Sequence, residues 1–287
     1  MHYTLNESLP PLDRPVLVAA LDGWVDAAGA ASAAGAHLAE PGLEVAAFDP
    51  DALFDYRSRR PALDVIDGVL TELTWPAMTI NHVQPDGRTD VLVLNGAEPD
   101  LNWQQLSSDL AELCARLNVR QWITLGAIPA AIPHTRPVPV MATASADGLL
   151  HNGERRGPDG RLRVPAAAVS VFEAAVTAAG VPAVGFFAQI PPYAGSGYTA
   201  GTVALLRHLE RHLDLAIPLR ALEETARQES DRYDAAVEND PETKEIVSRL
   251  EFMGDEEQLP TGEELASELE RFLREHNDDE ASGPGFG

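Results

Sequence analysis

Residues 15–21 have the sequence PVLVAAL and are followed directly by Asp22 and Gly23. A run that is this short and continuously apolar is typical of a strand buried on both faces of a sheet. The Ala-rich residues 26–40 follow, and Asp26 is suited to cap a helix or to lie in its first turn. This strand–loop–helix unit predicts the start of an α/β fold.

The same alternation continues along the chain. We expect further strands over residues 43–48, 89–94, 121–125, 138–145 and 181–189, and helices over residues 103–117, 166–179 and 199–213. Residues 71–76 and 78–84 alternate apolar and polar side chains, which favours a hairpin or edge strands, and residues 151–163 resemble a surface hairpin or loop. The pattern predicts an α/β sandwich with a mainly parallel sheet and with functional loops at the carboxyl ends of the strands.

The composition excludes several classes of function. The 287 residues include 21 Lys and Arg against 45 Asp and Glu, so the net charge of −24 argues against nucleic-acid binding. Lys244 is the only lysine, which leaves no Walker lysine, and the single cysteine, Cys114, excludes an internal disulfide and a cysteine-ligated metal site. The sequence has neither a run of 18 apolar residues nor a signal peptide pattern. We therefore expect a cytoplasmic protein with no membrane partner, and we expect Cys114 to be buried and inert.

The acidic charge is concentrated near the C-terminus. Residues 221–287 contain 21 acidic and 6 basic residues, a net charge of −15. We expect an α/β domain over residues 1–218, an acidic helical extension over residues 219–276 that packs only partly on the domain, and a disordered tail over residues 277–287. Thr261 and Glu264 form a capping-box pattern for the last helix. The extension is either a solvated face that aids solubility or a segment that binds a partner.

The loop after the first strand contains Asp22, Gly23, Trp24 and Asp26. Gly23 permits a tight turn, and the two carboxylates lie near a helix N-terminus, whose dipole stabilises negative charge. These acids could act as a general base or bind a hard metal ion, or they could form only a cap and a turn.

The loop over residues 125–137 is apolar and contains three prolines, with His134, Thr135 and Arg136 together near its end. His134 could transfer protons, and Arg136 could bind a carboxylate or a phosphate. The structural alternative is that Arg136 pairs with a carboxylate of the protein and His134 bonds to a carbonyl.

A third loop follows the strand at residues 181–189 and contains Gln189, Tyr193 and several glycines. The glycines resemble a phosphate-binding loop only superficially, because no G-x-G-x-x-G motif follows the first strand. We expect this loop to line the same cleft or an interface.

Together, the three loops resemble the proteasome assembly chaperone 2 family. The matching motifs are Gly23-Trp24-x-Asp26-Ala27, Pro133-His134-Thr135-Arg136-Pro137 and Gly185-Phe186-x-Ala188-Gln189-x-Pro191-x-Tyr193, within a similar region over about residues 15–219. The resemblance implies a three-layer α/β/α fold like that of purine nucleoside phosphorylases. It also implies self-association and, from archaeal and eukaryotic members, binding to proteasome subunits. The chain ends in Gly285-Phe286-Gly287, which departs from the hydrophobic-Tyr-any-residue tail with which such chaperones can dock.

Two classes of function follow. The first is a non-enzymatic binding or assembly protein without a cofactor or metal, in which Gly23, Trp24, Pro133, His134, Thr135, Arg136, Gln189 and Tyr193 contribute to binding. The second is an enzyme or small-molecule binder, hydrolase- or phosphorylase-like, that uses Asp22, Asp26, His134 and Arg136. We expect Asp26 to pair with Arg136, because both loops leave adjacent strand ends, and we expect a homo-oligomer, with a trimer slightly favoured.

Overall fold

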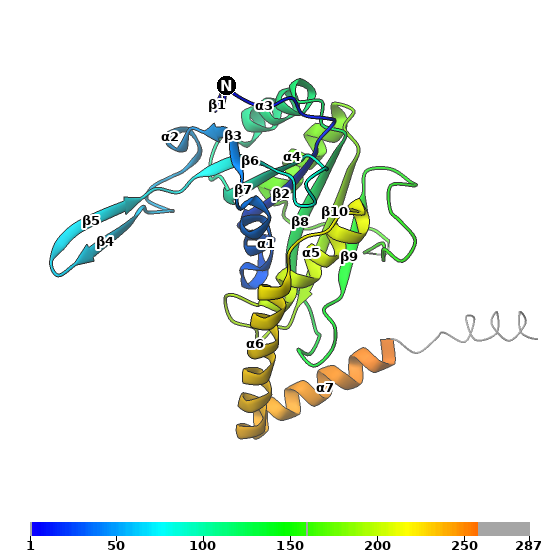
Figure 1. The fold of residues 1–287 in the computed structure, drawn as a ribbon. Helices are drawn as coiled ribbons and strands as arrows, with labels where there is room; N and C mark the ends of the chain where they lie inside the picture. The colour runs from blue at the N-terminus through cyan, green and yellow to red at the C-terminus, as the bar shows by residue number, and fades with distance from the viewer. Residues whose placement is uncertain (1, 159, 258–287) are drawn as a thin grey trace, which may run out of the picture.

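A single eight-stranded sheet forms the centre of the molecule in the computed structural model, which describes residues 2–158 and 160–257 (Figure 1). In spatial order its strands are β1 (Tyr3–Leu5), β3 (Leu43–Phe48), β6 (Met78–Val83), β7 (Val91–Ala97), β2 (Val16–Asp22), β8 (Gln121–Pro129), β10 (Ala183–Ile190) and β9 (Val140–Ala144). The neighbours β7, β2, β8 and β10 are parallel, and every other pairing is antiparallel. The expectation of a mainly parallel sheet therefore holds only at its centre. For β6 and β7 the reason is that the short connection between them has no crossover helix, which parallel pairing requires.

Helices cover both faces of the sheet. The helices α1 (Ala30–Ala39), which follows the short turn η1 (Ala27–Gly29), and α5 (Thr199–Leu213) pack on one face. The helices α3 (Trp103–Arg116) and α4 (Ala168–Ala178) pack on the other, and a short α2 (Pro50–Leu53) follows β3. Alternate residues of β2 enter the two cores: Val16, Val18 and Ala20 face α1 and α5, whereas Leu17, Ala19 and Leu21 lie in the core beneath α3 and α4. Burial on both faces explains the unbroken apolar run, and the predicted three-layer α/β/α sandwich is confirmed.

A separate two-stranded hairpin projects from the body (Figure 1). Its strands are β4 (Ala62–Ile66) and β5 (Val69–Thr74), joined at Asp67 and Gly68, whose φ angles of 51° and 81° are those of a tight hairpin turn. The expected hairpin between residues 71–76 and 78–84 is therefore wrong. Residues 71–74 pair instead with the unanticipated β4, while β6 lies between β3 and β7 and is not an edge strand.

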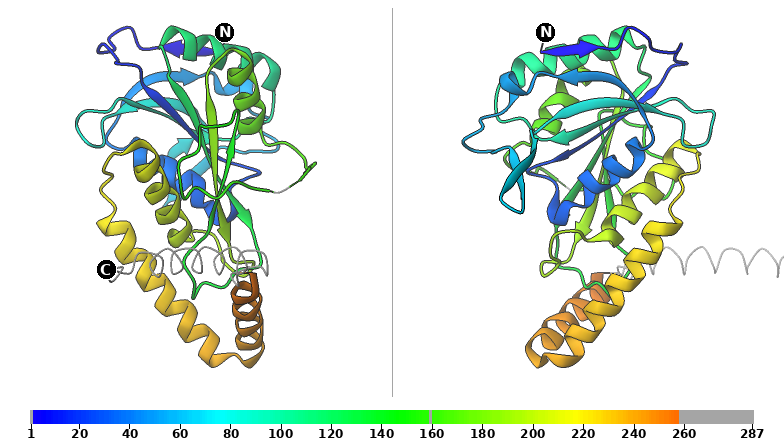
Figure 2. Two further views of the ribbon diagram at one scale, coloured as in Figure 1. Left: turned by 90° about the vertical axis from the view of Figure 1, so that its right-hand side faces the viewer. Right: turned by 60° about the vertical axis from the view of Figure 1, so that its left-hand side comes forward.

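The acidic extension begins as two helices, α6 (Arg220–Asn239) and α7 (Pro241–Glu257), which meet at a sharp corner beside the body (Figure 2). None of the side chains of α6 is buried, whereas α7 buries Val247 and Leu250. The helices match the expectation as far as Glu257. The remainder of the extension, with its Thr261–Glu264 capping box, and the expected tail over residues 277–287 lie outside the described residues.

Cys114 is buried in the core under α3, and burial raises the pKa of its thiol to about 12. The expectation of an inert thiol is therefore consistent with its surroundings. Among the described residues, none of the helices is both long enough and apolar enough to span a bilayer.

The close approach of α1 to β2 generates a first prediction. A Cβ atom on Gly35 would lie 2.8 Å from Cβ of Ala20 and 3.3 Å from its carbonyl oxygen. We expect Gly35→Val to lower the free energy of unfolding by ~1–3 kcal/mol, because α1 must move off the sheet to admit the side chain. Urea unfolding measures this effect. The matched control is Ala36→Val, at an exposed position of the same helix, and an equal loss in both variants would show that the contact with Ala20 is unimportant.

Candidate functional site

Gly23 and Trp24 are held by a carboxylate from another strand. One oxygen of Glu98 (Oε2) accepts a hydrogen bond from the Trp24 backbone N–H at 2.8 Å, and the other (Oε1) accepts from the N–H of Ala168 at the start of α4, at 2.6 Å. A Cβ atom on Gly23 would lie 2.2 Å from Oε2 of Glu98, so this contact requires glycine. The side chain of Trp24 remains 67% exposed. The turn is therefore rigid, and it presents an indole to solvent.

The two aspartates of the first loop have different environments. Asp22 is exposed and pairs with Arg59, with Nη1 3.1 Å from Oδ2. Asp26 Oδ1 accepts from the N–H groups of Ala31 at 2.7 Å and Ser32 at 3.1 Å, so Asp26 caps the first turn of α1 as expected. Its Oδ2 is buried, and none of the described residues forms a hydrogen bond with it. The predicted Asp26–Arg136 pair is therefore wrong, because the N–H groups of α1 already stabilise this carboxylate.

His134 is buried and contacts two other segments. Its backbone N–H donates to the hydroxyl of Tyr193 at 2.8 Å, and its Nδ1 lies 2.7 Å from the same oxygen. Nε2 lies 3.3 Å from Oδ1 of Asp234 on α6. Because the Tyr193 oxygen accepts from the backbone, its own proton is available for Nδ1, and this assigns the imidazole proton to Nε2, facing Asp234. His134 therefore bonds a hydroxyl and a carboxylate rather than the expected carbonyl.

The rings around His134 form an aromatic cluster, which consists of His134, Tyr193, Tyr198 and Tyr233. The ring centroid of His134 lies 5.6 Å from that of Tyr193 and 5.3 Å from that of Tyr233. Burial raises the pKa of Tyr193, so its hydroxyl keeps the proton that this hydrogen-bond network requires. The second and third predicted loops thus meet directly at the His134–Tyr193 contact, and Tyr233 of α6 packs against both rings.

Carboxylates of the extension bind uncharged donors of the body. Oε1 of Glu251 on α7 accepts from the Thr135 hydroxyl at 2.6 Å. Glu229 on α6 accepts from both the backbone N–H and the hydroxyl of Thr199, at 2.9 and 2.7 Å, at the first residue of α5. The extension therefore packs only partly, as its exposed α6 shows, yet several of its acids face the body rather than solvent.

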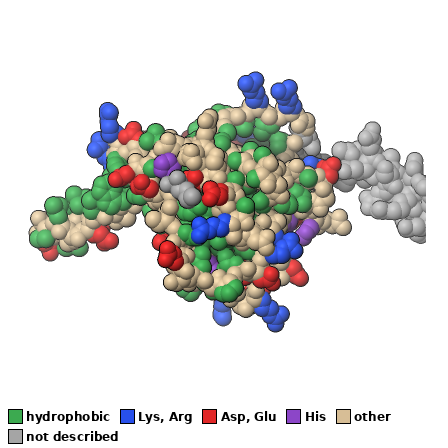
Figure 3. All heavy atoms as spheres, turned by 90° about the horizontal axis from the view of Figure 1, so that it is seen from above, with side chains coloured by type: hydrophobic (Ala, Val, Ile, Leu, Met, Phe, Trp, Pro, Cys, Tyr) green, Lys and Arg blue, Asp and Glu red, His purple; other side chains and the backbone are tan. Residues whose placement is uncertain are grey.

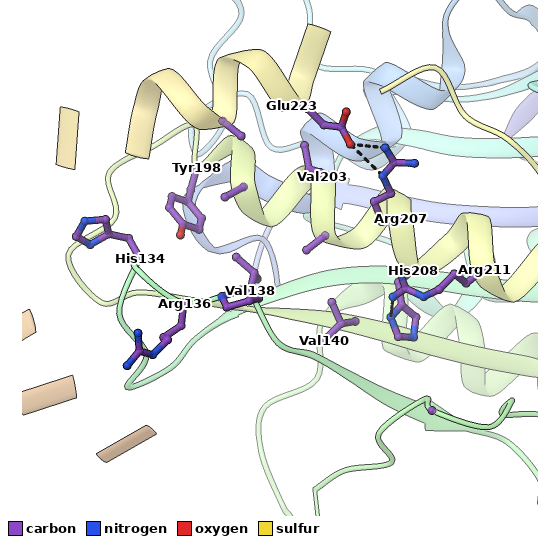
Figure 4. Close-up of a pocket in the computed structure, with 15 residues that line it drawn as sticks. His134, Arg136, Val138, Val140, Tyr198, Val203, Arg207, His208, Arg211 and Glu223 are labelled. Atoms are coloured by element: carbon purple, nitrogen blue, oxygen red, sulfur yellow. Dashed lines mark hydrogen bonds and ion pairs between the residues drawn. The ribbon is translucent and has the colours of Figure 1, made fainter. Parts of the chain in front are cut away.

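A cavity of about 580 Å³ lies between α5, α6 and the segment that leads into β9 (Figure 4). His134 and Arg136 line it, together with Val138, Tyr198 and Arg207; Arg207 is paired with Glu223 and Glu210. Neither Asp22 nor Asp26 lines this cavity. The four residues of the enzyme hypothesis are therefore not brought into one site.

The other residues of the expected binding set lie nearby. Pro133 is buried beside His134, Thr135 and Arg136 are exposed, and Gln189 donates its backbone N–H to the carbonyl of Pro139 at 2.9 Å. Pro133 and the backbone of Gln189 thus shape the loops. Trp24, Thr135 and Arg136 have the exposed side chains.

The β4–β5 hairpin projects from the body with many exposed apolar side chains (Figure 3). Every residue of both strands is exposed, and six large apolar side chains are between 48% and 68% exposed: Leu63, Val65, Ile66, Val69, Leu70 and Leu73. Its base is fixed, since Trp75 packs edge-on against Tyr56 at 4.7 Å and the Tyr56 hydroxyl donates to Asp51 at 2.6 Å. The hairpin is thus anchored at one end and uncovered along its length.

A second exposed surface lies beyond the opposite edge strand, β9. As expected, residues there form a surface loop, and it contains what we call the Arg-rich surface: Arg155, Arg156, Arg161, Leu162, Arg163 and Val164, all exposed. The hairpin is inserted between β3 and β6, near the other edge of the sheet. The two surfaces therefore lie on opposite sides of the molecule.

Residues 20–237 match the model of the PAC2 family. The chain belongs to this family. The match confirms the resemblance in the three loops, and it continues beyond residue 219 into α6, past Asp234. PAC2 membership therefore includes the helix that contacts His134.

Several solved structures are similar to this PAC2 chain. Mycobacterium tuberculosis Rv2714, described as of unknown function, is 34% identical with a TM-score of 0.83, covering 88% of this chain and 90% of its own. Mycobacterium tuberculosis Rv2125, described as a proteasome-assembly chaperone homologue, is 38% identical with a TM-score of 0.72, covering 81% and 99%. Pyrococcus furiosus PbaB, described as an archaeal proteasome activator, shares the fold at 15% identity and a TM-score of 0.63, covering 82% and 97%. No curated protein matches the chain.

The Tyr193 hydroxyl provides a test of the aromatic cluster. We expect Tyr193→Phe to lower the free energy of unfolding by ~1–3 kcal/mol, because the buried His134 N–H and Nδ1 lose their partner. Chemical denaturation measures the loss. The matched control is Tyr198→Phe, since the described residues make no hydrogen bond to that hydroxyl although its ring lies in the same cluster. Equal stability of the wild type and Tyr193→Phe would contradict the assigned network.

Proposed function

We propose that this PAC2 protein is a non-enzymatic assembly factor of the cytoplasm that associates with itself and binds subunits of a larger complex, with proteasome subunits as the first candidate. The observation that carries the proposal is the exposed apolar β4–β5 hairpin. Family membership and the 38% identical relative described as a proteasome-assembly chaperone homologue support the choice of partner.

The hairpin requires a protein partner on physical grounds. An isolated two-stranded hairpin is at best marginally stable in water, and here both faces carry exposed apolar side chains. Contiguous exposed apolar surface marks protein–protein contacts. Because the Tyr56–Trp75 contact anchors its base, the hairpin projects as a defined shape that another protein can cover.

Charge supports a second copy of the chain as that protein. Asp64 lies directly opposite Glu72 across the two strands, and Asp67 lies in the turn. Opposed like charges destabilise a strand pair unless a cation lies between them. The Arg-rich surface supplies such cations beside the apolar Leu162 and Val164, and it lies at the opposite side of the molecule. A hairpin that docks on the next copy's Arg-rich surface makes a head-to-tail contact. Such a contact gives a ring where the rotation between copies closes and a filament where it does not, and we propose a closed trimer.

The enzyme alternative has less support. His134 and Arg136 line a cavity, but Asp22 pairs with Arg59 and Asp26 caps α1. The hydroxyl beside Nδ1 of His134 belongs to Tyr193, which also accepts from the His134 backbone N–H and whose pKa is raised by burial, so this pair suits a structural role better than an activated nucleophile.

Self-association through the hairpin is testable by charge. We expect Ile66→Asp with Leu70→Asp to shift the mass measured by light scattering from an oligomer to a single chain, because the substitutions place charge in the proposed interface. Both side chains are exposed in one chain, so the body should remain folded. Leu101→Asp, at an exposed position outside the hairpin, is the matched control and should leave the mass unchanged.

A charge swap identifies the opposing surface. Asp64→Arg with Glu72→Arg should dissociate the oligomer, as should Arg161→Glu with Arg163→Glu, and combining the four substitutions should restore it. If the variant with Ile66→Asp and Leu70→Asp still forms the oligomer, the hairpin is excluded as the interface. Failure of the combined variant to reassociate excludes the Arg-rich surface.

Partner binding needs a separate measurement. Immobilised wild-type chain should retain proteasome subunits purified from the same organism, and Trp24→Ala should retain less, because it removes an exposed indole without touching the backbone contact to Glu98. Retention no greater than that of bare resin would reject the proteasome as partner, while self-association would still be decided by the mass measurement.

A further inference from the structure

A cluster of metal-ligating side chains lies between α5 and the loop after β9, apart from the hairpin and next to the cavity at His134, whose lining includes Gly153 and His208. It consists of His151, Glu154 and His212, and one ligand atom from each lies within 4.8 Å of the others. His208 is one helical turn before His212 on α5, and its Nε2 is 3.8 Å from Oε1 of Glu154. No local sequence pattern joins these residues, because Glu154 and His212 are 58 residues apart.

Glu154 is a buried carboxylate among imidazoles. Its side chain is only 7% exposed; Oε2 accepts from the His151 backbone N–H at 2.8 Å, and Oε1 lies 2.9 Å from Nδ1 of His212. The two rings are themselves enclosed, since the side chain of His212 is 1% exposed and that of His208 is 7% exposed. Within the described part of the chain, the ion-pair partners of Glu154 are these histidines alone, and Glu154 has no Arg or Lys partner. Burying a carboxylate away from water is costly, and a cation bound beside it would offset that cost.

His208 provides an independent observation. Its Nδ1 accepts from Nη2 of Arg211 at 3.0 Å, so in the neutral ring Nε2 carries the proton. This Nε2 is buried on a side chain that is only 7% exposed, it faces Glu154, and within residues 2–158 and 160–257 it has no hydrogen-bond partner. Buried N–H groups normally have a hydrogen-bond acceptor, so the Nε2–H of His208 indicates that an acceptor belongs at this place. A water molecule on a bound ion, or the carboxylate drawn toward that ion, would supply it.

We propose that His151, Glu154 and His212 bind a divalent transition-metal ion of the Zn²⁺ type, with His208 hydrogen-bonded to the site rather than ligating. Two imidazoles and one carboxylate are a donor set that zinc accepts while keeping a fourth position for water.

The surroundings fit this proposal. His151 is exposed, and together with His212 it lines a cavity of about 380 Å³, so an ion has a path from solvent. If His212 ligates through Nδ1, its Nε2 must carry a proton, and this atom is 3.0 Å from the side-chain amide of Gln121. Turning that amide over presents its oxygen as the acceptor, which is the usual support for a ligating histidine. A bound ion would fasten residues 151–154 to α5 and fix the start of the loop that contains the Arg-rich surface.

The test is a titration of the full, tag-free chain with Zn²⁺ after treatment with a chelator, followed by calorimetry. We expect saturable binding of one ion per chain and an absorption spectrum of tetrahedral coordination when Co²⁺ replaces Zn²⁺. His151→Ala and Glu154→Gln should each weaken binding at least about tenfold. Because His151 is exposed, its substitution should leave the circular dichroism spectrum unchanged, which separates a lost ligand from a lost fold.

The matched control is His37→Ala, on α1 and outside the site, which should bind as the wild type does. Absence of saturable binding by the wild type overturns the proposal. Binding that His151→Ala and Glu154→Gln leave unchanged also overturns it, since the ion would then lie elsewhere.

Discussion

Burial of β2 on both faces is the constraint on which the other parts of the structure depend. Each face packs against a pair of helices, so the loops between strands and helices lie at the ends of the strands. The backbone N–H groups at the starts of the helices that follow these loops need hydrogen-bond partners. Carboxylates meet this need at three helix N-termini: Asp26 at α1, Glu98 at α4 and Glu229 at α5. Each stabilises N–H groups that the helix cannot satisfy itself. Asp26, one of the two acids that the sequence offered as catalytic, is thus among the carboxylates that hold the helices in place.

The sequence predicts the parts of this fold whose signals are local. The apolar run of β2 and the Leu spacing of α3 correspond to observed elements. The Asp67-Gly68 turn also has a local signal, a turn dipeptide between apolar residues, although it lies outside the strands expected from the sequence. β8 runs to Pro129, beyond the end expected at Gly126, because Gly126 does not break the strand: a Cβ there would lie 2.5 Å from the Phe187 ring, so the glycine makes room for that side chain.

The site depends on contacts that no local pattern contains. His134 and Asp234 are 100 residues apart, and Thr135 and Glu251 are 116 apart. The sequence identified His134, Thr135 and Arg136 as a group but could not show that α6 and α7 cover them. The PAC2 match through residue 237 includes Tyr233 and Asp234, which is consistent with α6 belonging to the family's common structure. For Asp26 the local contact is the decisive one. The N–H groups at the start of α1 stabilise its carboxylate, so it does not need a distant arginine as a partner.

The β4–β5 hairpin and the Arg-rich surface lie at opposite edges of the sheet, and if they form the head-to-tail contact that we propose, their placement has a genetic consequence. A head-to-tail contact uses a different surface on each partner, so a chain that has lost only its hairpin still accepts the hairpin of an intact neighbour. Such a chain cannot bind a further copy through its own hairpin, so the ring of copies cannot close. In a cell that makes both forms, damaged copies would therefore inactivate intact ones. Alleles with hairpin lesions would then be dominant, whereas alleles that destroy the core would be recessive.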